Sequence, residues 1–573
     1  MQQVSEVQGH TTMIYGSPYD DSFSYPAIDI PDLILDRNLK GVAPEKPAII
    51  DGDTGKTVYS YNSLRERIRD FGGFLQHDLG IKKGDVVSYL SFNTTYYPII
   101  IHAILAAGGT VSAFNPAYTP EEIAHSLKLA KPNHILVQDG LVENLESAFR
   151  ILGQSVLLPS VHVLDGQHKK YPCYEVERIL AQIPTWPPLQ RIKRTPQQTK
   201  DDVAFICFSS GTSGLVKGVR LTHGNVVANV HQQGRCLANM FTPETVFTLI
   251  VPFYHILGLA GFCIQYLAHG APIVVFKKFE LEKFLESVAR DRVTHINVVP
   301  PIALAILQSP LSTKADFSSV RCLMNAAAPL KDNLAKALCK LVGCVVTQWY
   351  GMTEASPSVI SQREDEAHVA GTIGRLLPGM QLRIIDEDGR DVPNGTPGEL
   401  LIRGPNLMAR YQGQEESVAK SELVDGFFRT GDAGYIDDNG FIYLTDRVKE
   451  LIKVKGNQVA PAELESILLS HPRVTDAAVC GLYLDDEATE YPVAYITTAE
   501  PAHKHAQLVA DVADFVAGQV AQYKRLRAGV QVLDAIPKNP SGKILRRLLP
   551  ARTSPETAAV AARAFRSATR SKL

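Results

Sequence analysis

The chain has 573 residues, which is too long for a single hydrophobic core, so two or more domains are expected. Hydrophobic residues make up 45% and charged residues 21%, as in ordinary soluble globular proteins. The formal net charge is −2, so the composition does not indicate a large basic surface for nucleic acid. The eight cysteines are scattered without a CxxC pair, so free thiols are favoured over metal ligands or disulfides.

The two ends of the chain differ in the targeting signals they carry. The N-terminus, MQQVSEVQGH, has neither a basic start nor an apolar core, so it predicts no signal peptide. The chain ends in Ser571-Lys572-Leu573, which is a peroxisomal address that an import receptor reads. We therefore expect a peroxisomal protein with that receptor as a partner.

Taken in chain order, residues 1–45 show little periodicity and are expected to form an arm. Leu64, Ile68, Phe71 and Leu75 then recur at helical spacing. The apolar stretch 96–114 is broken by a Gly-Gly pair, which favours a buried helix and strand over a membrane span. Further elements are predicted as helices at 97–107 and 119–130 and strands at 110–114, 134–138, 271–276, 294–301 and 343–351.

This alternation of short apolar strands with helices predicts an α/β protein with largely parallel sheets. After about residue 380 the pattern changes to antiparallel hairpins, one of them turning at Asn439-Gly440. A charged joint follows, and then a small α/β segment. The predicted domains are an arm (1–45), a large domain (46–446, β-rich and barrel-like from about 380), a C-terminal domain (447–550, hinge near Lys449) and a tail (551–573).

The stretch FSSGTSGLVKGV (208–219) combines hydroxyls, glycines and one lysine between a predicted strand and a predicted helix. It is not a Walker A loop, because Val216 stands five residues after Gly211 where that motif needs glycine. The dinucleotide pattern G-x-G-x-x-G also fails. The composition still suits phosphate, since hydroxyls and amides can hold phosphate oxygens while Lys217 offsets their charge.

Three later segments supply groups that would complement a phosphate loop. TQWYGMTEAS (347–356) contains aromatic residues and Glu354, a carboxylate of the kind that holds Mg²⁺ beside phosphates. Asp432 follows a Thr-Gly turn and could accept hydrogen bonds from two ribose hydroxyls. Lys543 lies in a loop rich in proline and glycine. Together these segments indicate a nucleotide site.

The chain resembles the adenylate-forming superfamily, most closely its branch of 4-coumarate–CoA ligases, luciferases and acyl-CoA ligases. The resemblance extends from about residue 45 to 550. It implies a large N-terminal domain of parallel-sheet α/β subdomains with a small β-barrel-like part, and a small mobile α+β C-terminal domain. The matching motifs are SSGTSGLVKGV, PFYHILGL, NAAAPL, QWYGMTEA, GTIGRLLPG, GELLIRGP, FRTGDAGYIDDNG, DRVKELIKVKGNQVAPAELE, YKRLR and PKNPSGKILRR.

The resemblance also implies an ATP site. The loop over the β- and γ-phosphates would comprise Ser209, Ser210, Gly211, Thr212, Ser213, Gly214 and Lys217. The residues around adenine would be Ala326, Ala327, Gln348, Trp349, Tyr350 and Gly351. The remaining ATP contacts would be Thr353 at the α-phosphate, Glu354 with Thr212 at Mg²⁺, and Asp432 with Arg447 at the ribose.

The resemblance assigns other residues to the two half-reactions, which are adenylation of the acid and thioester formation with CoA. Lys543 would serve adenylation, Lys449 would be the hinge, and Lys453 with Gln458 would serve thioester formation. Lys455 and Gly456 would border the CoA tunnel. The pocket for the acid would be lined by His255, Leu257, Ala260, Ala326, Ala355, Pro357 and Val359.

Single residues also have structural interpretations. His255 alone is more typical of a structural histidine, although within PFYHILGL the family role, closing or lining the acid pocket, is favoured. Arg546 and Arg547 are expected on the surface of the tail. The chain departs from the family pattern at Val216, where proline is usual, at Ser213, where threonine is frequent, and at Ala326, which could narrow the pocket.

The predicted function is an AMP-forming carboxylate–CoA ligase that uses ATP, Mg²⁺ and CoA. The acid would be aryl (4-coumarate- or phenylacetate-like) or medium-chain aliphatic. One alternative is an adenylating relative that uses the adenylate for luciferase-type oxidation or for loading a carrier protein. A second is the acyl-activating step of a secondary-metabolite pathway. Another is an inactive nucleotide-binding or scaffold protein, but the residues whose loss would mark it are present: Lys217, Glu354, Asp432 and Lys543.

Overall fold

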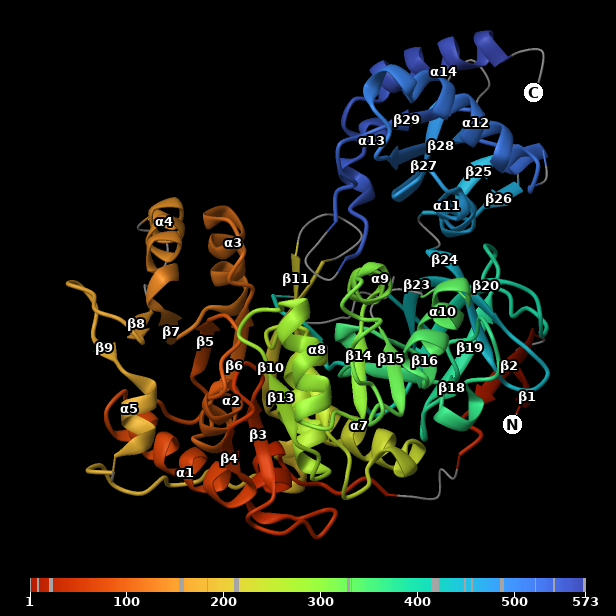
Figure 1. Cartoon of the computed structure of the whole chain (residues 1–573). Coiled ribbons are helices and arrows are strands. Elements are labelled where there is room, and N and C mark those ends of the chain that lie inside the picture. Colours follow the sequence, from red (N-terminus) through yellow and green to blue (C-terminus); the bar gives the residue numbers. More distant parts are fainter. Residues whose placement is uncertain are drawn as a thin grey trace. The chain divides into compact units, whose positions relative to one another are not determined.

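The computed structural model describes residues 2–7, 10–19, 24–153, 159–182, 184–210, 216–326, 330, 332–413, 422–447, 450–454, 457–484, 489–520, 522–538 and 542–569. The chain divides into two compact units, which are coloured by sequence in Figure 1. Unit 1 comprises Tyr15–Gln381 and Arg403–Phe428, and unit 2 comprises Gln2–Ile14, Leu382–Ile402 and the chain from Arg429 onward. The domain limits predicted from the sequence stay predictions.

The first sheet of unit 1 has eight strands in the order β21-β11-β10-β6-β5-β7-β8-β9. Strands β5 to β10 are parallel to their neighbours in this sheet, whereas β11 and β21 are antiparallel additions at one edge. The bounds are β5 Val86–Leu90, β6 Thr110–Phe114, β7 His134–Gln138, β8 Ser160–Leu164, β9 Cys173–Tyr174, β10 Val203–Ser210, β11 Val216–Thr222 and β21 Arg410–Tyr411.

The second sheet of unit 1 has nine strands in the order β18-β17-β16-β15-β14-β12-β13-β3-β4. Its central strands, from β16 to β3, are all parallel. The bounds are β3 Pro47–Asp51, β4 Thr57–Ser60, β12 Phe247–Leu249, β13 Ile273–Val275, β14 His295–Val298, β15 Cys322–Asn325, β16 Val345–Gly351, β17 Ser358–Ser361 and β18 Arg375–Leu376. The predicted class, α/β with parallel sheets, is confirmed.

Helices connect these strands, and several of them begin at a capping box. Thr119 accepts from the Glu122 backbone N–H while the Glu122 side chain caps the Thr119 N–H, which starts the helix predicted there. Figure 1 shows α1 beside α2 and α3 beside α4. The bounds are α1 Tyr61–His77, α2 Tyr97–Ala106, α3 Pro120–Ala130, α4 Val142–Leu152, α5 Val176–Ala181, α6 Pro196–Asp201, α7 His223–Cys236, α8 Leu281–Arg290, α9 Pro300–Gln308 and α10 Asp332–Val342.

The predicted arm contains regular structure. Strands β1 (Gln2–Val7) and β2 (His10–Gly16) join the sheet β1-β2-β19-β20-β23-β22, in which β24 also pairs with β23. A π-helical turn follows at Asp32–Asp36. The other bounds of this sheet are β19 Gln381–Ile385, β20 Gly398–Arg403, β22 Leu423–Val424, β23 Phe427–Ile436 and β24 Ile442–Arg447.

The C-terminal part of unit 2 is a small α+β structure with its own apolar core. It contains the hairpin β25-β26 and the three-stranded sheet β27-β28-β29. Among the helices that the structure describes, none has the length and apolarity that a membrane crossing needs. The bounds are β25 Ile452–Val454, β26 Asn457–Val459, β27 Asp476–Leu484, β28 Thr489–Thr497, β29 Val530–Val532, α11 Pro461–Ser470, α12 His505–Ala517, α13 Pro550–Thr553 and α14 Pro555–Thr569.

Candidate active site

The two ends of the glycine loop meet in an antiparallel ladder of unit 1. Ser209 near the end of β10 lies directly opposite Lys217 at the start of β11. The loop residues between these strands, Gly211, Thr212, Ser213 and Gly214, are outside the described residues, as are the side-chain contacts of Ser210. The pairing of β10 with β11 therefore presents a hydroxyl and a lysine side by side at the base of the predicted phosphate loop.

Lys217 has two partners that the sequence did not reveal. Its Nζ lies 2.7 Å from Oε1 of Glu422 and 4.4 Å from the centre of the Tyr411 ring. Both charged side chains are partly shielded, with 33% of Lys217 and 23% of Glu422 exposed. The carboxylate of Glu422 thus occupies a position on Lys217 that an anionic ligand such as phosphate would also favour.

Glu354 is a buried carboxylate that shares the neighbours Ser209 and Tyr411 with Lys217. It lies in a 3-10 turn, Thr353–Ala355, and is 7% exposed. Its Oε1 accepts hydrogen bonds from Ser209 Oγ at 2.9 Å and from the Tyr411 hydroxyl at 3.0 Å. Burial, together with the charges of Glu354 and Glu422, raises the pKa of Tyr411, so its hydroxyl stays protonated and donates. We call Ser209, Lys217, Glu354, Tyr411 and Glu422 the carboxylate cluster.

Strand β16 carries the residues predicted around adenine. These residues lie within β16, as the strand predicted at 343–351 implies, and their side chains alternate between the two faces of the sheet. Trp349 therefore points away from the face shared by Gln348 and Tyr350. Gly351 cannot be replaced without distortion, because a Cβ there would lie 2.1 Å from the Pro357 carbonyl oxygen.

Most of the residues predicted to line the acid pocket come from two segments of unit 1. One further residue, Ala326, follows β15. Leu257 and Ala260 lie on the π-helical segment Leu257–Tyr266, and both are buried. Burial lowers the pKa of His255, so its imidazole is neutral at pH 7, and its Nδ1 accepts from the Leu257 N–H at 3.3 Å. The second segment follows β16 and contributes Ala355, Pro357 and Val359 to the predicted acid pocket. All three residues are buried. Ala327 lies outside the described residues.

The turn that carries Glu354 is held by a buried amide. Asn406 is fully buried, and its Nδ2 donates to the carbonyls of Ala355 at 2.7 Å and Ser358 at 2.9 Å. Asn229 on α7 donates to the same Ser358 carbonyl at 2.9 Å. The Met408 N–H donates to the Glu354 carbonyl at 2.7 Å. These bonds fix the backbone on both sides of the carboxylate.

In unit 2, antiparallel ladders pair the residues predicted for ribose and thioester formation. Asp432 lies opposite Arg447, and Lys453 lies opposite Gln458. Asp432 is 8% exposed, and its N–H donates to Thr430 Oγ1 at 3.0 Å. The preceding Gly431 has φ +72°, a conformation that favours glycine. Lys449, Lys455 and Gly456 lie outside the described residues.

Lys543 lies in a loop of unit 2 that closes on itself. Lys538 and Ile544 form an isolated antiparallel bridge, and the Leu545 N–H donates to the Pro537 carbonyl at 2.8 Å. Arg546, three residues further on, was expected on the surface, but its side chain is only 14% exposed. That prediction is wrong because acidic partners from elsewhere in the domain enclose the guanidinium. Arg547 is exposed, as expected.

The fit of Mg²⁺ rests on the carboxylate cluster. Over the part of the chain that the structure describes, no three His, Cys, Asp or Glu side chains gather as a metal site. Mg²⁺ characteristically binds one or two protein carboxylates and takes its other oxygens from water and substrate phosphates. Glu354 fits that pattern, because it accepts a hydrogen bond from Ser209 at the base of the predicted phosphate loop.

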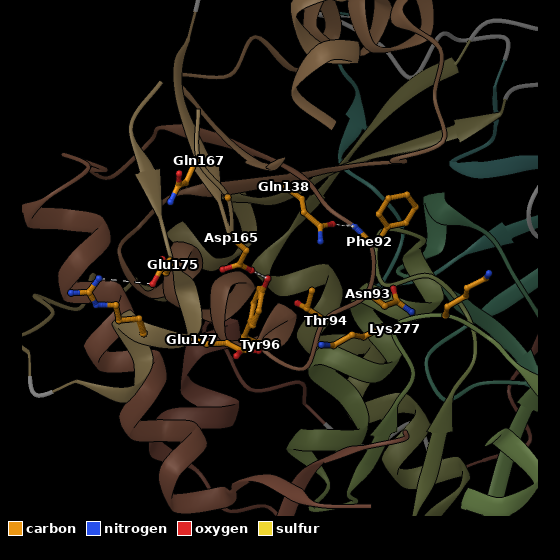
Figure 2. Close-up of a pocket in the computed structure, with 13 residues that line it drawn as sticks. Phe92, Asn93, Thr94, Tyr96, Gln138, Asp165, Gln167, Glu175, Glu177 and Lys277 are labelled. Atoms are coloured by element: carbon orange, nitrogen blue, oxygen red, sulfur yellow. Dashed lines mark hydrogen bonds and ion pairs between the residues drawn. The ribbon is translucent and has the colours of Figure 1, made fainter. Parts of the chain in front are cut away.

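A large open pocket of unit 1 lies away from these residues. It has a volume of about 1140 Å³ and lies at the carboxyl ends of β5, β7 and β8. Figure 2 shows Phe92, Gln138 and Asp165 around it, with Lys277 following β13. None of the predicted site residues lines this pocket. Its acidic and basic side chains are mixed, so its electrostatics favour neither an anion nor a cation.

Two family models cover most of the chain. The AMP-binding enzyme model matches residues 36–412, and the model of the AMP-binding enzyme C-terminal domain matches residues 463–543. The chain belongs to the AMP-binding enzyme family. The resemblance inferred from the motifs is therefore confirmed, and the two matches include the carboxylate cluster up to Tyr411 and the Lys543 loop.

Named relatives place this AMP-binding enzyme among the CoA ligases. A probable CoA ligase of Humulus lupulus is 35% identical over 91% of this chain and 92% of that protein. A peroxisomal OPC-8:0-CoA ligase of Arabidopsis thaliana is 34% identical over 91% and 92%. The o-succinylbenzoate CoA synthetase of Bacillus subtilis, solved with ATP and magnesium, has a TM-score of 0.74 and 25% identity, covering 91% of this chain and 99% of that one. The chain is accordingly an acid–thiol ligase of the adenylate-forming CoA ligase group.

Sequence reasoning missed Tyr411 and Glu422 in this AMP-binding enzyme. Tyr411 stands in MARYQG, a few residues after the GELLIRGP motif, where an aromatic residue two positions before a glycine is an available but weak signal. Glu422 belongs to no motif. Its role depends on the contact with Lys217, which is 205 positions away in the sequence.

Proposed function

We propose that this AMP-binding enzyme activates a carboxylic acid with ATP and transfers the acyl group to CoA. The observation that carries the proposal is the carboxylate cluster, in which a buried carboxylate and a lysine flank the phosphate loop. A carboxylate and a cation at one loop match the needs of a metal–triphosphate complex. The family match supports the nucleotide, and the relatives' printed names support CoA as acceptor.

In the first half-reaction, a carboxylate oxygen of the acid attacks the α-phosphorus of ATP. The bond from the α-phosphorus to the oxygen bridging to the β-phosphorus breaks, and pyrophosphate leaves with that electron pair. Negative charge rises on the α-phosphate, where Lys543 would offset it. Lys217 would exchange the Glu422 carboxylate for oxygens of the β- and γ-phosphates. Thr353 would contact the α-phosphate, and Asp432 with Arg447 would hold the ribose.

Mg²⁺ would be held by Glu354, with Thr212 from the loop, and would neutralise the charge of the triphosphate when bound. Glu354 is suited to this role because it is buried and its Oε1 is positioned by two hydroxyl donors. Adenine would contact the segment that contains Ala326 and the Gln348–Gly351 part of β16.

In the second half-reaction, the CoA sulfur attacks the acyl carbonyl carbon, and the carbon–oxygen bond to AMP breaks. AMP leaves with the electron pair, and the thiol proton passes to solvent or a nearby base. Lys453 and Gln458, opposite each other in β25-β26, would serve this step. Lys455 and Gly456 would border the path of CoA. Lys449 would be the hinge at which the C-terminal domain moves between the two half-reactions.

The acid is proposed to be aryl or medium-chain aliphatic. The residues assigned to its pocket are apolar and mostly buried, apart from a neutral His255, and carry no side chain that would pair with a second charge on the substrate. Peroxisomal localisation is proposed from Ser571-Lys572-Leu573, and a relative with a peroxisomal name supports it.

One assay tests the function. The purified chain is mixed with ATP, Mg²⁺, CoA and a panel of aryl and medium-chain acids, and AMP, pyrophosphate and thioester are measured. We expect thioester and AMP in equal amounts with at least one acid. AMP release without thioester, or light emission, would favour the alternatives. If no acid in the panel yields AMP, the proposed function is wrong.

A further inference from the structure

Arg546 joins three parts of the C-terminal domain. Its Nε donates to the Val479 carbonyl at 2.9 Å, and one terminal nitrogen donates to Glu465 Oε1 at 2.7 Å. The other terminal nitrogen pairs with Glu450 Oε2. The guanidinium thus contacts β27, helix α11 and the segment before β25 at the same time. A planar fork of donors can make these contacts together, whereas a lysine ammonium cannot.

These contacts lie in a shielded environment. The side chains are 14% exposed in Arg546, 10% in Glu465 and 25% in Glu450. Oε1 of Glu465 also accepts the Val479 N–H at 2.8 Å, so Arg546 and Glu465 both contact the Val479 peptide. Hydrogen bonds between charged groups out of bulk water hold their geometry more strictly than exposed ion pairs do.

The Lys543 loop is held at both of its ends. On the N-terminal side, Lys538 Nζ lies 2.6 Å from Asp476 Oδ2 on β27. On the C-terminal side, Arg546 provides the contacts described above. The bridge between Lys538 and Ile544 closes the loop between these two attachments. The backbone of Lys543 is therefore three residues from the Arg546 attachment and five from Lys538.

We propose that Arg546 is a positioning residue, which fixes the Lys543 loop to Glu450 so that the segment after the hinge and the catalytic lysine move as one rigid piece. The proposal rests on the proposed function, in which Lys543 serves adenylation and Lys449 is the hinge. Glu450 is the first described residue after that hinge. A catalytic lysine on a loosely held loop would reach the α-phosphate in the wrong place, and small misplacements cost large factors in rate.

The test compares the two half-reactions in Arg546→Ala, Arg546→Lys and Glu450→Gln. Adenylation is measured by acid-dependent pyrophosphate exchange, and thioester formation is measured with a supplied acyl-adenylate and CoA. We expect Arg546→Ala to lower adenylation roughly 10²-fold and to leave thioester formation within about threefold. Arg546→Lys should recover only part of the loss. Arg547→Ala is the matched control, because Arg547 is its exposed neighbour.

A double-mutant cycle separates positioning from folding. If Arg546 acts through Lys543, Arg546→Ala should have almost no further effect on adenylation in the Lys543→Ala background. Additive losses overturn the proposal, and so does an equal loss of both half-reactions in every variant. Glu450→Gln keeps a hydrogen-bond acceptor for Arg546 and leaves no buried charge unpaired. It therefore tests the contact between residues 450 and 546 in a folded protein. We expect a smaller loss of adenylation, roughly five- to tenfold, with an unchanged melting temperature.

The outcomes distinguish the two proposals. If wild-type protein makes no adenylate from any acid, the proposed function fails. If the wild-type protein is active and Arg546→Ala and Glu450→Gln keep normal adenylation, only the positioning role fails.

Discussion

The two lysines assigned to ATP chemistry are held in different ways. In unit 1, the residues assigned to function make the structural contacts themselves. Lys217 pairs with Glu422, and Glu354 accepts hydrogen bonds from Ser209 and Tyr411. In unit 2, salt bridges fall on residues that flank Lys543 in sequence, at Lys538 and Arg546. The contacts of Lys217 and Glu354 must be exchanged when a ligand arrives, whereas the salt bridges of Lys538 and Arg546 orient the loop in advance.

This difference follows from the proposed tasks. A lysine that binds the phosphates of a substrate is charged before and after binding, so a carboxylate partner offsets the charge until phosphate replaces it. A lysine that acts on a developing charge contributes most when its location is set beforehand. Substitutions around Lys217 should therefore differ in their kinetic effects from substitutions at Lys543.

The largest expected effect is at Lys543. Lys543→Ala should lower adenylation roughly 10²- to 10³-fold, because a positioned cation at a developing negative charge is lost. Thioester formation from a supplied acyl-adenylate should be nearly unchanged. Pyrophosphate exchange and thioester assays check the two steps, with the exposed Lys504→Ala as control. Equal loss of both steps would remove Lys543 from its assigned role.

Tyr411→Phe should have the next largest effect. The ring over Lys217 is kept, but Glu354 loses one of its hydroxyl donors. We expect kcat/KM for ATP to fall about tenfold and the Mg²⁺ concentration for half-maximal activity to rise. Mn²⁺ binding to the ATP-loaded protein, followed by paramagnetic relaxation, gives a readout that is independent of turnover. Tyr483→Phe, at an exposed tyrosine, is the control. Unchanged metal binding would show that the hydroxyl does not orient Glu354.

Glu422→Gln should have a smaller effect, and of opposite sign. Without the competing carboxylate, Lys217 is available to phosphate, so KM for ATP should fall roughly two- to fivefold while kcat changes little. The gain should shrink at high salt, which screens a partly exposed pair. Steady-state kinetics against Glu282→Gln, an exposed acid on α8, checks this. A higher KM would mean that Glu422 supports the site.

The smallest expected effect is a difference in acid stability between the units. Burial lowers the pKa of four histidines of unit 1 to about 4: His102, His162, His231 and His269. The unfolded chain takes up these protons near pH 6.5, so unit 1 should lose stability as the pH falls from 6.5 toward 4. Both tryptophans, Trp186 and Trp349, lie in unit 1 and report its unfolding by fluorescence. Hydrogen exchange should show unit 2 opening at lower pH, and simultaneous opening would contradict this.

Much of the fold could be predicted from the sequence because its signals are local. Leu64, Ile68, Phe71 and Leu75 recur on one side of α1 and are buried. Thr119 and Glu122 begin α3 through contacts between residues three positions apart. The Asn439-Gly440 turn joins β23 to β24. Caps, turns and periodicity depend on near neighbours, so one sequence is enough to recognise them.

The sequence by itself determined the family, and it predicted the phosphate loop and the residues assigned to chemistry, since all of these are carried by contiguous motifs. Only the tertiary structure decided how the residues are held. Glu422 reaches Lys217 across 205 positions, Tyr411 reaches Glu354 across 57, and Glu450 reaches Arg546 across 96. Such contacts depend on strand order and burial, which bring distant segments together and enclose charges that would otherwise be solvated. For the same reason Arg546, which in the sequence looks like a residue of the tail surface, is the strongest candidate for orienting the Lys543 loop.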